Sequence, residues 1–352
     1  MVNLFVPKET GAGETRVAAT PESARALIKG GLTVSIERGA GEAAYMPDSE
    51  YQTAGATLVS RAEGLAAADI VAAVGAPAAE DIARMKKGSI LIALRATAQP
   101  GITTFSMERI PRTTKAQTMD ALSSQASIAG YKAALIAATE LPRYFPLLMT
   151  AAGTIKPAKV VVMGAGVAGL QALATARRLG AVVEVSDIRP AVKEQVQSLG
   201  GRFIDLPMQE SGEGAGGYAK EVSADFLRQQ REIVTRHVAA ADVVITTAQV
   251  PGKKAPVLLT REMVEGMRPG SIIIDLAVDS GGNCELTKPG QTVHNGVRIF
   301  GISNLAATMS HDASILYARN IQALVFEFVQ KGVLNLNMEN EIIRETVVKG
   351  SS

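Results

Sequence analysis

Short apolar runs rich in β-branched residues recur along the chain and alternate with longer amphipathic segments. In the first third of the chain these runs lie at residues 4–6, 32–37, 70–74, 90–94 and 103–105. Beyond it they lie at residues 160–163, 181–186, 243–246 and 272–275. Short continuous apolar runs are typical of strands buried on both faces, and the helical segments between them predict β-α-β units. The fold class is therefore α/β, with mostly parallel sheets that carry helices on both faces.

The order of these segments divides the chain into two domains. A helix begins at Pro21, because Thr20 is a typical N-cap and proline is favoured at the first helical position. A late helix follows the last strand of the second set, which suggests that the chain returns to the first domain. We expect two Rossmann-like domains separated by a cleft, the first formed by residues 1–122 and 310–352 and the second by residues 123–309.

The apolar run at residues 160–163 is followed at once by Gly164, Gly166 and Gly169, which have the spacing of the dinucleotide fingerprint. An Ala-rich helical run follows the third glycine. In this motif the first glycine allows a tight turn, the second lets the backbone approach a pyrophosphate, and the third lets helix and strand pack closely. The start of the helix attracts phosphate, because its free N–H groups and its dipole favour negative charge.

An acidic residue, Asp187, follows the next strand at about the distance expected for a ligand of the adenosine ribose. Strand, glycines, helix and acid stand in the expected order, so dinucleotide binding is favoured over a structural Gly-rich turn without a ligand. A carboxylate at this position repels a 2′-phosphate, which favours NAD over NADP. Arg189 leaves NADP as the alternative coenzyme, because an arginine at this position could bind the 2′-phosphate. The first domain lacks a Gly-rich phosphate turn, so we expect it to hold no dinucleotide.

Composition narrows the class of protein further. Of the 352 residues, 47% are hydrophobic and 20% are charged, which is enough for about two domains with packed cores. A formal net charge of +2 without a concentrated basic patch gives no indication of nucleic-acid binding. The single cysteine, Cys284, rules out an internal disulfide, and no apolar run reaches the length of a membrane span.

A second candidate site is the polar stretch at residues 112–124, which lies between two apolar segments. Its donors and acceptors could hold a carboxamide and a ribose, and they come from Arg112, Gln117, Asp120 and Ser123. The competing interpretation is a solvated helix start, in which Asp120 and Ser123 cap the helix that follows. By themselves, the residues favour capping.

Groups suited to acid–base or metal chemistry do not stand out in the sequence. His237, His294 and His311 lack cysteines or carboxylates at ligand spacing, so we expect no metal site. A dehydrogenase that acts on an alcohol, amine or keto acid usually needs a proton donor or acceptor beside the reacting carbon. Direct hydride transfer between two nicotinamides needs only that the rings are held about 3–3.5 Å apart and that water is excluded.

The segment at residues 209–218 is rich in glycine and ends in Gly217 and Tyr218. Two interpretations have equal support from the residues alone. One is a solvated flexible loop, and the other is a lid in which Tyr218 closes over a cofactor.

Several stretches resemble one family of nucleotide-binding proteins. The opening segment, residues 7–22, resembles alanine dehydrogenase and the NAD(H)-binding component of proton-translocating transhydrogenase, which are relatives. The stretch at residues 116–131 decides between them, because it resembles the transhydrogenase loop named for its Arg, Gln and Asp. Further matches lie at residues 149–154, 216–221 and 251–253.

Two departures separate the chain from alanine dehydrogenase. That enzyme would need a pyruvate-binding lysine in the run that is Ala73-Val74-Gly75-Ala76-Pro77 here, and a catalytic histidine where this chain has Arg95. Arg16 and Asp279 match both families and do not discriminate.

The resemblance implies roles for matching positions. The nicotinamide end of NAD(H) would be held by Arg112, Gln117, Asp120 and Ser123. The pyrophosphate would lie over Ala165, Gly166 and Val167, and the adenosine would meet Asp187, Ile188 and Arg189. A mobile lid would include Gly217 and Tyr218. Gln249 would lie near the cofactor, although it replaces the aliphatic residue expected there.

The function that the resemblance implies is direct hydride transfer between NADH and NADP bound on a partner component, coupled to proton movement across a membrane. The implied partners are NADP(H)-binding and membrane-spanning transhydrogenase components, together with a second copy of the chain in a homodimer. The implied location is peripheral, at the cytoplasmic face of the inner membrane. An enzyme like alanine dehydrogenase and a nucleotide-binding regulatory module without hydride transfer remain the alternatives.

Overall fold

The computed structural model describes residues 1–207, 224–249 and 253–348. The chain divides into two compact units, and the second is inserted into the sequence of the first. Unit 1 comprises Met1–Ala126 and Ala306–Ser352, and unit 2 comprises Ser127–Leu305. The long helix α5 (Ala121–Glu140) begins in unit 1 and ends in unit 2.

Unit 1 is built on a sheet of six parallel strands in the order β3-β2-β1-β4-β5-β6. The strands are β1 (Asn3–Val6), β2 (Thr33–Glu37), β3 (Thr57–Val59), β4 (Ile70–Ala72), β5 (Ile90–Ala93) and β6 (Thr103–Ser106). The strand order reverses between β1 and β4. Doubly wound sheets bind their ligands at the carboxyl ends of the strands beside such a reversal.

Helices cover both faces of this sheet. They are α1 (Pro21–Lys29), α2 (Asp48–Thr53), α3 (Arg61–Ala67), α4 (Ala79–Arg84), α10 (Ser310–Phe328) and α11 (Glu341–Thr346). Side chains alternate along β1, so Leu4 and Val6 share a core with residues of α1 and α10. Phe5 belongs to the core of the other face, together with Leu65 of α3 and Met85 at the end of α4. A small pair of strands, β16 (Val329–Gln330) and β17 (Val333–Leu334), follows α10.

The start of α1 shows how local chemistry determines an element. The Thr20 side chain accepts a hydrogen bond from the Ser23 amide, and Ser23 Oγ accepts one from the Thr20 amide, which together form a capping box. Pro21 occupies the first helical position, and Gly30 ends the helix. The predicted helix is therefore confirmed with its cap.

Unit 2 repeats this plan with a sheet of seven strands in the order β11-β10-β9-β12-β13-β15-β14. The strands are β9 (Lys159–Met163), β10 (Val182–Ser186), β11 (Arg202–Phe203), β12 (Val243–Thr246), β13 (Ile272–Asp275), β14 (Gly290–His294) and β15 (Val297–Gly301). All neighbours are parallel except β14 and β15, which form an antiparallel edge. The order reverses between β9 and β12, so the ligand-binding end of unit 2 lies beside these two strands.

The sheet of unit 2 is also buried on both faces. Its helices, besides α5, are α6 (Val167–Arg178), α7 (Lys193–Ser198), α8 (Ala224–Ala239) and α9 (Arg261–Glu265). Val160 and Val162 of β9 share one core with residues of α5, α6 and α7. Val161 and Met163 share the other core with residues of α8 and α9. The predicted α/β class, with Rossmann-like sheets covered by helices on both faces, is confirmed.

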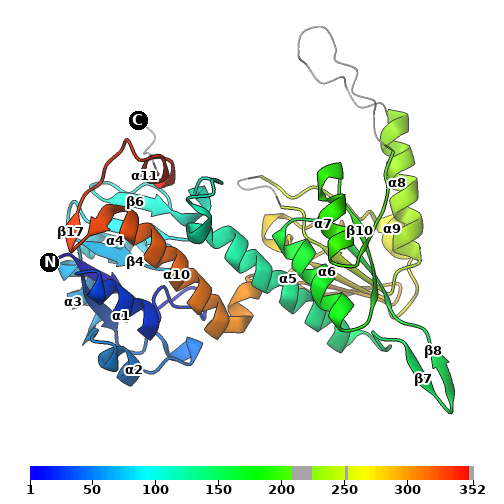
Figure 1. Cartoon of the computed structure of the whole chain (residues 1–352). Helices are drawn as coiled ribbons and strands as arrows, with labels where there is room; N and C mark the ends of the chain where they lie inside the picture. Colours follow the sequence, from blue (N-terminus) through cyan, green and yellow to red (C-terminus); the bar gives the residue numbers. More distant parts are fainter. Residues whose placement is uncertain (208–223, 250–252, 349–352) are drawn as a thin grey trace, which may run out of the picture. The chain divides into compact units, whose positions relative to one another are not determined.

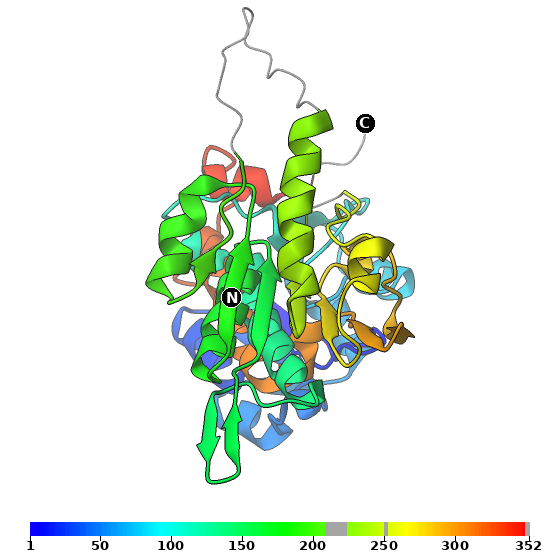
Figure 2. The ribbon, with the colours of Figure 1, turned by 90° about the vertical axis from the view of Figure 1, so that its right-hand side faces the viewer.

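Two further features of the fold bear on the site. The helix α5 begins at Ala121, because Asp120 caps it and makes a polar first turn possible. The residues before β9 form a hairpin of β7 (Leu148–Thr150) and β8 (Gly153–Ile155), which projects from unit 2 (Figures 1 and 2).

Candidate dinucleotide-binding site

The loop between β9 and α6 has the geometry that its first and third glycines require. Gly164 has a φ of 103°, in the region that favours glycine, and a Cβ added to it would lie 2.7 Å from Thr247 Oγ1. A Cβ added to Gly169 would lie 1.8 Å from the carbonyl oxygen of Gly164. Any larger residue at position 169 would therefore displace the loop from the helix.

Gly166 differs from the other two glycines, because no neighbour among the described residues requires a glycine there. Its φ of −79° is open to any residue, and no atom of the described residues lies within 4 Å of the place of an added Cβ. The residue is exposed. A glycine without an internal steric reason fits a backbone position that an external group approaches closely, as a pyrophosphate does in this motif.

The first turn of α6 is suited to an anion. Gly166 is the N-cap and supplies no side-chain hydrogen bond, and the first turn carries no acidic residue. Arg177 and Arg178 lie in the last turn, where they complement the negative end of the helix dipole. The free N–H groups at the start of the helix match the charge of a dinucleotide pyrophosphate.

Side chains that follow the two neighbouring strands hold this loop from both sides. From the end of β12, Thr247 Oγ1 donates to the carbonyl oxygen of Gly164 at 3.0 Å. From the end of β10, Asp187 accepts a hydrogen bond from the Ala165 amide at 2.7 Å. Because β9 lies between β10 and β12, the glycine loop is clamped in place before any ligand binds.

Asp187 also forms a bidentate ion pair with Arg189. The guanidinium donates from Nε and from Nη2, each at 2.9 Å, to the two carboxylate oxygens. Burial acts to raise the pKa of Asp187, but hydrogen bonds from Arg189 and from the Ala165 amide outweigh it and lower the pKa below its ordinary value. The carboxylate is therefore ionised at neutral pH, as a ligand of ribose hydroxyls should be.

The other predicted cofactor residues on this loop differ in exposure. Ala165 is buried, whereas Val167 is 43% exposed and Ile188 is 84% exposed. An exposed apolar residue at the end of β10 suits contact with an adenine ring, which has apolar faces.

Three predicted residues give less information. Gln249 follows β12, and its side chain donates to the carbonyl oxygen of Leu276, so it is engaged with the segment after β13. Gly217 and Tyr218, the predicted lid residues, lie outside the described residues.

The predicted nicotinamide residues lie in unit 1, in the segment that leads into α5. Asp120 accepts hydrogen bonds from the Ser123 amide at 2.9 Å and from the Ser123 hydroxyl at 2.6 Å, which is the geometry of a helix cap. Arg112 and Gln117 are exposed, and neither side chain has a hydrogen-bond partner in the described part of the chain. Asp120 and Ser123 thus cap α5, while Arg112 and Gln117 remain available to a ligand.

Buried amides that the sequence did not single out anchor this segment to α10. Asn320 donates to the Thr118 carbonyl at 2.7 Å and accepts from the Ser124 hydroxyl at 2.7 Å. Gln125 donates to the Ala313 carbonyl at 3.1 Å. The sequence offered no clear local signal for them, because both helices carry other polar residues as well.

A further residue that the sequence did not indicate supports the glycine loop from α5. A Cβ added to Gly130 would lie 2.0 Å from the carbonyl oxygen of Ala168, in the first turn of α6. Gly130 therefore allows α5 to approach the start of the phosphate-binding helix, and its place in a helix gave no hint of this contact.

Two family models match the chain. The N-terminal domain of the alanine dehydrogenase/PNT family matches residues 5–129, and the C-terminal domain matches residues 133–351. A protein of Rhodospirillum rubrum, named as the first portion of NAD(P) transhydrogenase subunit alpha, is 45% identical over 368 residues, which cover 99% of this chain and 96% of the relative. The chain belongs to the NAD(P) transhydrogenase alpha subunit family.

Solved structures and more distant relatives agree with this membership. The crystal structure of a transhydrogenase from Sinorhizobium meliloti has a TM-score of 0.88 and 44% identity, and the match covers 98% of this chain and 97% of that one. Alanine dehydrogenase of Bacillus subtilis is 28% identical, over 97% of this chain and 89% of the relative. The resemblance noted in the sequence, to transhydrogenase first and alanine dehydrogenase second, is confirmed.

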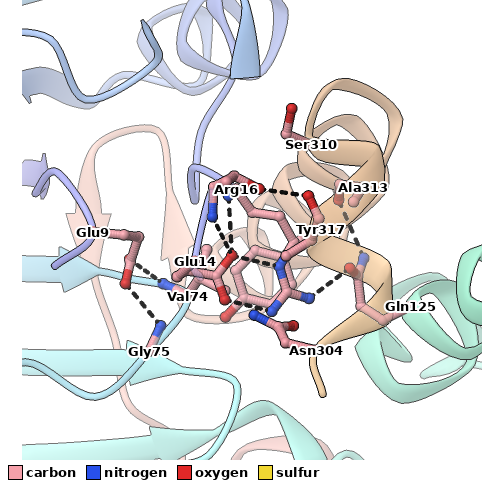
Figure 3. A network of polar contacts seen from close by, with 12 residues as sticks. Glu9, Glu14, Arg16, Val74, Gly75, Gln125, Asn304, Ser310, Ala313 and Tyr317 are labelled. Atoms are coloured by element: carbon pink, nitrogen blue, oxygen red, sulfur yellow. Dashed lines mark hydrogen bonds and ion pairs between the residues drawn. The ribbon is translucent and has the colours of Figure 1, made fainter. Parts of the chain in front are cut away.

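At the carboxyl edge of the unit 1 sheet, the position that corresponds to the glycine loop of unit 2 is filled by the chain's own side chains (Figure 3). The Glu9 carboxylate accepts hydrogen bonds from the Val74 amide at 2.7 Å and from the Gly75 amide at 3.1 Å, just beyond β4. The Arg16 guanidinium is 5% exposed and donates to Glu14 from Nε at 2.8 Å and from Nη2 at 2.6 Å. An internal carboxylate thus occupies the backbone amides at the switch point of unit 1.

Burial gives Glu9 an unusual ionisation. Desolvation raises the pKa of Glu9 from its ordinary 4.5 to about 7, and the Glu14 carboxylate adds to the rise. The amides of Val74 and Gly75 and the charge of Arg16 act in the opposite direction but do not outweigh burial.

A metal site finds no support in the described part of the chain, where no group of three or more His, Cys, Asp or Glu side chains could hold an ion. His237 pairs with Glu184 at 2.6 Å, and His294 pairs with Glu265 at 2.9 Å.

Proposed function

We propose that the chain is the NAD(H)-binding component of a proton-translocating transhydrogenase. Unit 2 binds NAD(H) at the carboxyl edge of its sheet. The hydride passes directly between this coenzyme and NADP(H) held by a partner component, and membrane-spanning components couple the transfer to proton movement. The proposal extends what is shown, namely membership of the transhydrogenase alpha subunit family.

The observation that carries the coenzyme assignment is the open backbone at Gly166. The start of α6 offers uncapped N–H groups for the pyrophosphate, and the ionised Asp187 lies beside the same loop for the adenosine ribose. Under this proposal Ala165, Gly166 and Val167 lie under the pyrophosphate, and Ile188 and Arg189 meet the adenosine with Asp187. The lid residues Gly217 and Tyr218 and the loop residue Gln249 are part of the same proposal.

The nicotinamide end of the coenzyme is assigned to the segment before α5. Its exposed Arg112 and Gln117 supply donors that suit a carboxamide and ribose hydroxyls. Asp120 and Ser123 hold each other at the helix start, which fixes their orientation. None of these side chains needs to transfer a proton, because the bound coenzyme itself supplies or accepts the hydride.

The experiment that tests the proposal uses the full chain with and without an NADP-binding transhydrogenase component. Titration of the chain with NADH should show binding, with weaker binding of NADPH. Addition of the partner and NADPH should then reduce an NAD analogue whose absorbance differs from that of NADH. Binding without transfer to any such partner would instead favour a nucleotide-binding regulatory module.

An enzyme like alanine dehydrogenase is the second candidate, and the structure provides a specific observation on it. The run Ala73-Val74-Gly75, where that enzyme would need a lysine, offers its amides to Glu9 and its Ala73 carbonyl to the Tyr317 hydroxyl at 2.8 Å. This segment presents backbone to neighbouring side chains and no cationic group to a keto acid. Incubation of the chain with NAD and L-alanine should therefore yield no NADH, and steady turnover would overturn the transhydrogenase proposal.

Assembly is a further aspect of the proposal. In the described ranges no helix is both long and apolar enough to cross a membrane. We propose that the chain lies at the cytoplasmic face of the inner membrane, held there by its membrane-spanning partners.

We also propose a homodimer, and the projecting hairpin β7–β8 supports it. Apolar side chains on and beside the hairpin are exposed, at 54% for Tyr144, 54% for Leu147, 74% for Met149 and 39% for Ile155. A cluster of this kind is typical of a surface that a second polypeptide covers. Light scattering should report a dimer that Met149→Asp weakens, and a monomeric wild-type chain would contradict this aspect of the proposal.

A further inference from the structure

The segment after β13 folds back along the carboxyl edge of unit 2 around one buried carboxylate. Asp275 is fully buried, and its Oδ1 accepts a hydrogen bond from the Ala277 amide at 2.9 Å. Its Oδ2 accepts from the Asn283 amide at 2.7 Å, from the Cys284 amide at 3.0 Å and from the Thr287 hydroxyl at 2.7 Å. These four bonds fix the position of Asn283.

The side chain of Asn283 joins this segment to the one that follows β12. Asn283 is fully buried, and its Nδ2 donates to the Ala248 carbonyl and to the Pro256 carbonyl, both at 2.8 Å. Its Oδ1 accepts from the Ala248 amide at 3.1 Å. One carboxamide therefore pairs with both backbone groups of Ala248, so it determines where that residue lies.

Ala248 lies directly against the glycine loop. Its neighbour Thr247 donates to the Gly164 carbonyl, and the Ala248 nitrogen is 3.5 Å from the place of a Cβ added to Gly164. The loops after β9 and β12 flank the strand-order reversal, so they form the two walls at which a dinucleotide binds. Asn283 holds the second wall from behind.

The position of this wall indicates which half of the coenzyme it serves. The adenosine ligand, Asp187, follows β10, on one side of β9. A dinucleotide that extends across the reversal therefore places its other half, with the nicotinamide, toward the β12 side.

We propose that Asn283 is a positioning residue for the nicotinamide half of the bound coenzyme, which it serves through Ala248 without touching the coenzyme. This inference rests on the proposed function, because it takes NAD(H) as the ligand of unit 2. The site then has two halves. Asp187 and the start of α6 hold the adenosine and phosphate end of the coenzyme, and the hydrogen bonds of Asn283 to Ala248 position the wall at the nicotinamide end.

The test compares NADH with 5′-AMP, which carries only the adenosine end, on the full chain. Asn283→Asp keeps the size and the acceptor for the Ala248 amide but replaces the donor to Ala248 and Pro256 by a second acceptor. Asn283→Ser removes all three contacts. Both variants should weaken NADH binding about tenfold and leave the Kd of 5′-AMP within about twofold.

A matched control comes from the opposite edge of the same sheet. Asp242 is 5% exposed, accepts from the Lys159 amide at 2.9 Å, and pairs with Arg268 at 2.8 Å, so it clamps the amino ends of β9 and β12. Asp242→Asn should lower the melting temperature without changing the ratio of the two affinities. A merely structural role for Asn283 predicts the same result for its own variants.

Equal weakening of both ligands by the Asn283 variants, or unchanged NADH binding, would overturn the inference. A measurement on the unmodified chain gives a second test that does not depend on how the variants fold. NADH should slow amide hydrogen exchange in a peptide that includes Thr247 and Ala248, and 5′-AMP should not, whereas equal protection by both would contradict the inference. Failure of the wild-type chain to bind NADH at all would instead refute the proposed function.

Discussion

The two units share one strand plan and differ in what occupies the carboxyl edge of the sheet. Each sheet reverses its order beside its first strand, between β1 and β4 in unit 1 and between β9 and β12 in unit 2. In unit 2 the loop after the first strand leaves Gly166 exposed, and no described atom lies near the place of a Cβ. In unit 1 the loop after the first strand returns the Glu9 side chain to the amides of Val74 and Gly75.

The two units are alike, however, at the end of the second strand. In unit 2 this position is followed by Asp187, which binds the Ala165 amide of the glycine loop. In unit 1 the second strand ends in Glu37, which accepts from the Lys8 amide at 2.7 Å and pairs with Arg61 at 3.1 Å. Each of these acids therefore binds the backbone of the loop after the first strand and an arginine of its own unit, and the two edges differ in that loop. Function lies in the residues of the site and not in the fold.

The largest expected effect tests whether the glycine loop of unit 2 is the binding element. Gly169→Ala places a Cβ against the Gly164 carbonyl, and backbone cannot move aside as a side chain end can. We expect NADH binding to weaken about a hundredfold, with a loss of about 1–3 kcal/mol in the free energy of unfolding. Isothermal titration and thermal unfolding measure the two quantities.

Two matched glycines sharpen this result. Gly166→Ala meets no atom in the described ranges of the chain, so it should weaken NADH binding while unfolding stays within about 0.5 kcal/mol of wild type. Gly75→Ala, at the edge of unit 1, should leave NADH affinity unchanged. If the unit 1 variant weakened binding as much as Gly169→Ala, the contrast between the two edges would be wrong.

The second prediction concerns the closed edge of unit 1 and its dependence on pH. The folded chain raises the pKa of Glu9 from 4.5 to about 7, so folding disfavours the ionised form. The contribution of this group to stability is therefore greatest at low pH and falls as the pH rises from about 4.5 through about 7. Between about pH 5.5 and about pH 8 the wild type should lose about 2 kcal/mol of unfolding free energy that Glu9→Gln does not lose.

Denaturant titrations of both proteins across this range measure the difference. Glu37→Gln is the control, because that carboxylate belongs to the same edge but accepts from Lys8 and Arg61. If the unfolding free energies of wild type and Glu9→Gln changed with pH in the same way, the prediction for Glu9 would be wrong.

The sequence predicted what depends on neighbouring residues and missed what depends on distant ones. The strand β9, the three glycines and the Thr20 cap follow from local pattern, so the fold class and the glycine loop were accessible before the structure. The edge strand β14 (Gly290–His294) was missed, because it is largely exposed and lacks an apolar run. The capping interpretation of Asp120 and Ser123 agrees with the geometry, whereas their role at a nicotinamide stays a prediction.

The buried side chains that support the site could not be predicted from the sequence, for a physical reason. Asn283 meets Ala248 across 35 positions of sequence, and Asn320 meets Thr118 across 202. A hydrogen bond between residues this distant leaves no periodic trace in the chain. The role of Gly166, by contrast, could be predicted, because it follows from the spacing of three glycines within one short motif.

The third prediction tests whether unit 1, without a dinucleotide loop of its own, contributes to transfer rather than to binding. Asn caps helices about as well as Asp, so Asp120→Asn should retain the bond from the Ser123 amide that starts α5 and leave stability nearly unchanged. We expect the rate of hydride transfer to a reconstituted NADP-binding partner to fall about tenfold, and the Kd of NADH to stay within about twofold. Equal losses in rate and binding, or no loss in either, would count against a role at the reacting ring.

The smallest expected effect concerns coenzyme preference at the end of the second strand in unit 2. Asp187→Asn keeps an oxygen that can accept from the Ala165 amide but removes the charge that repels a 2′-phosphate. It also frees the Arg189 guanidinium, which in the wild type donates two hydrogen bonds to this carboxylate. Competition titrations should show the preference for NADH over NADPH reduced about fivefold, a modest change because Arg189 already offsets much of the charge in the wild type.

The control is the corresponding variant of unit 1, Glu37→Gln. It should not change the preference, because its carboxylate belongs to an edge that its own chain fills. An unchanged preference in Asp187→Asn would mean that the ribose is held elsewhere and that the two similar acids do not differ in function.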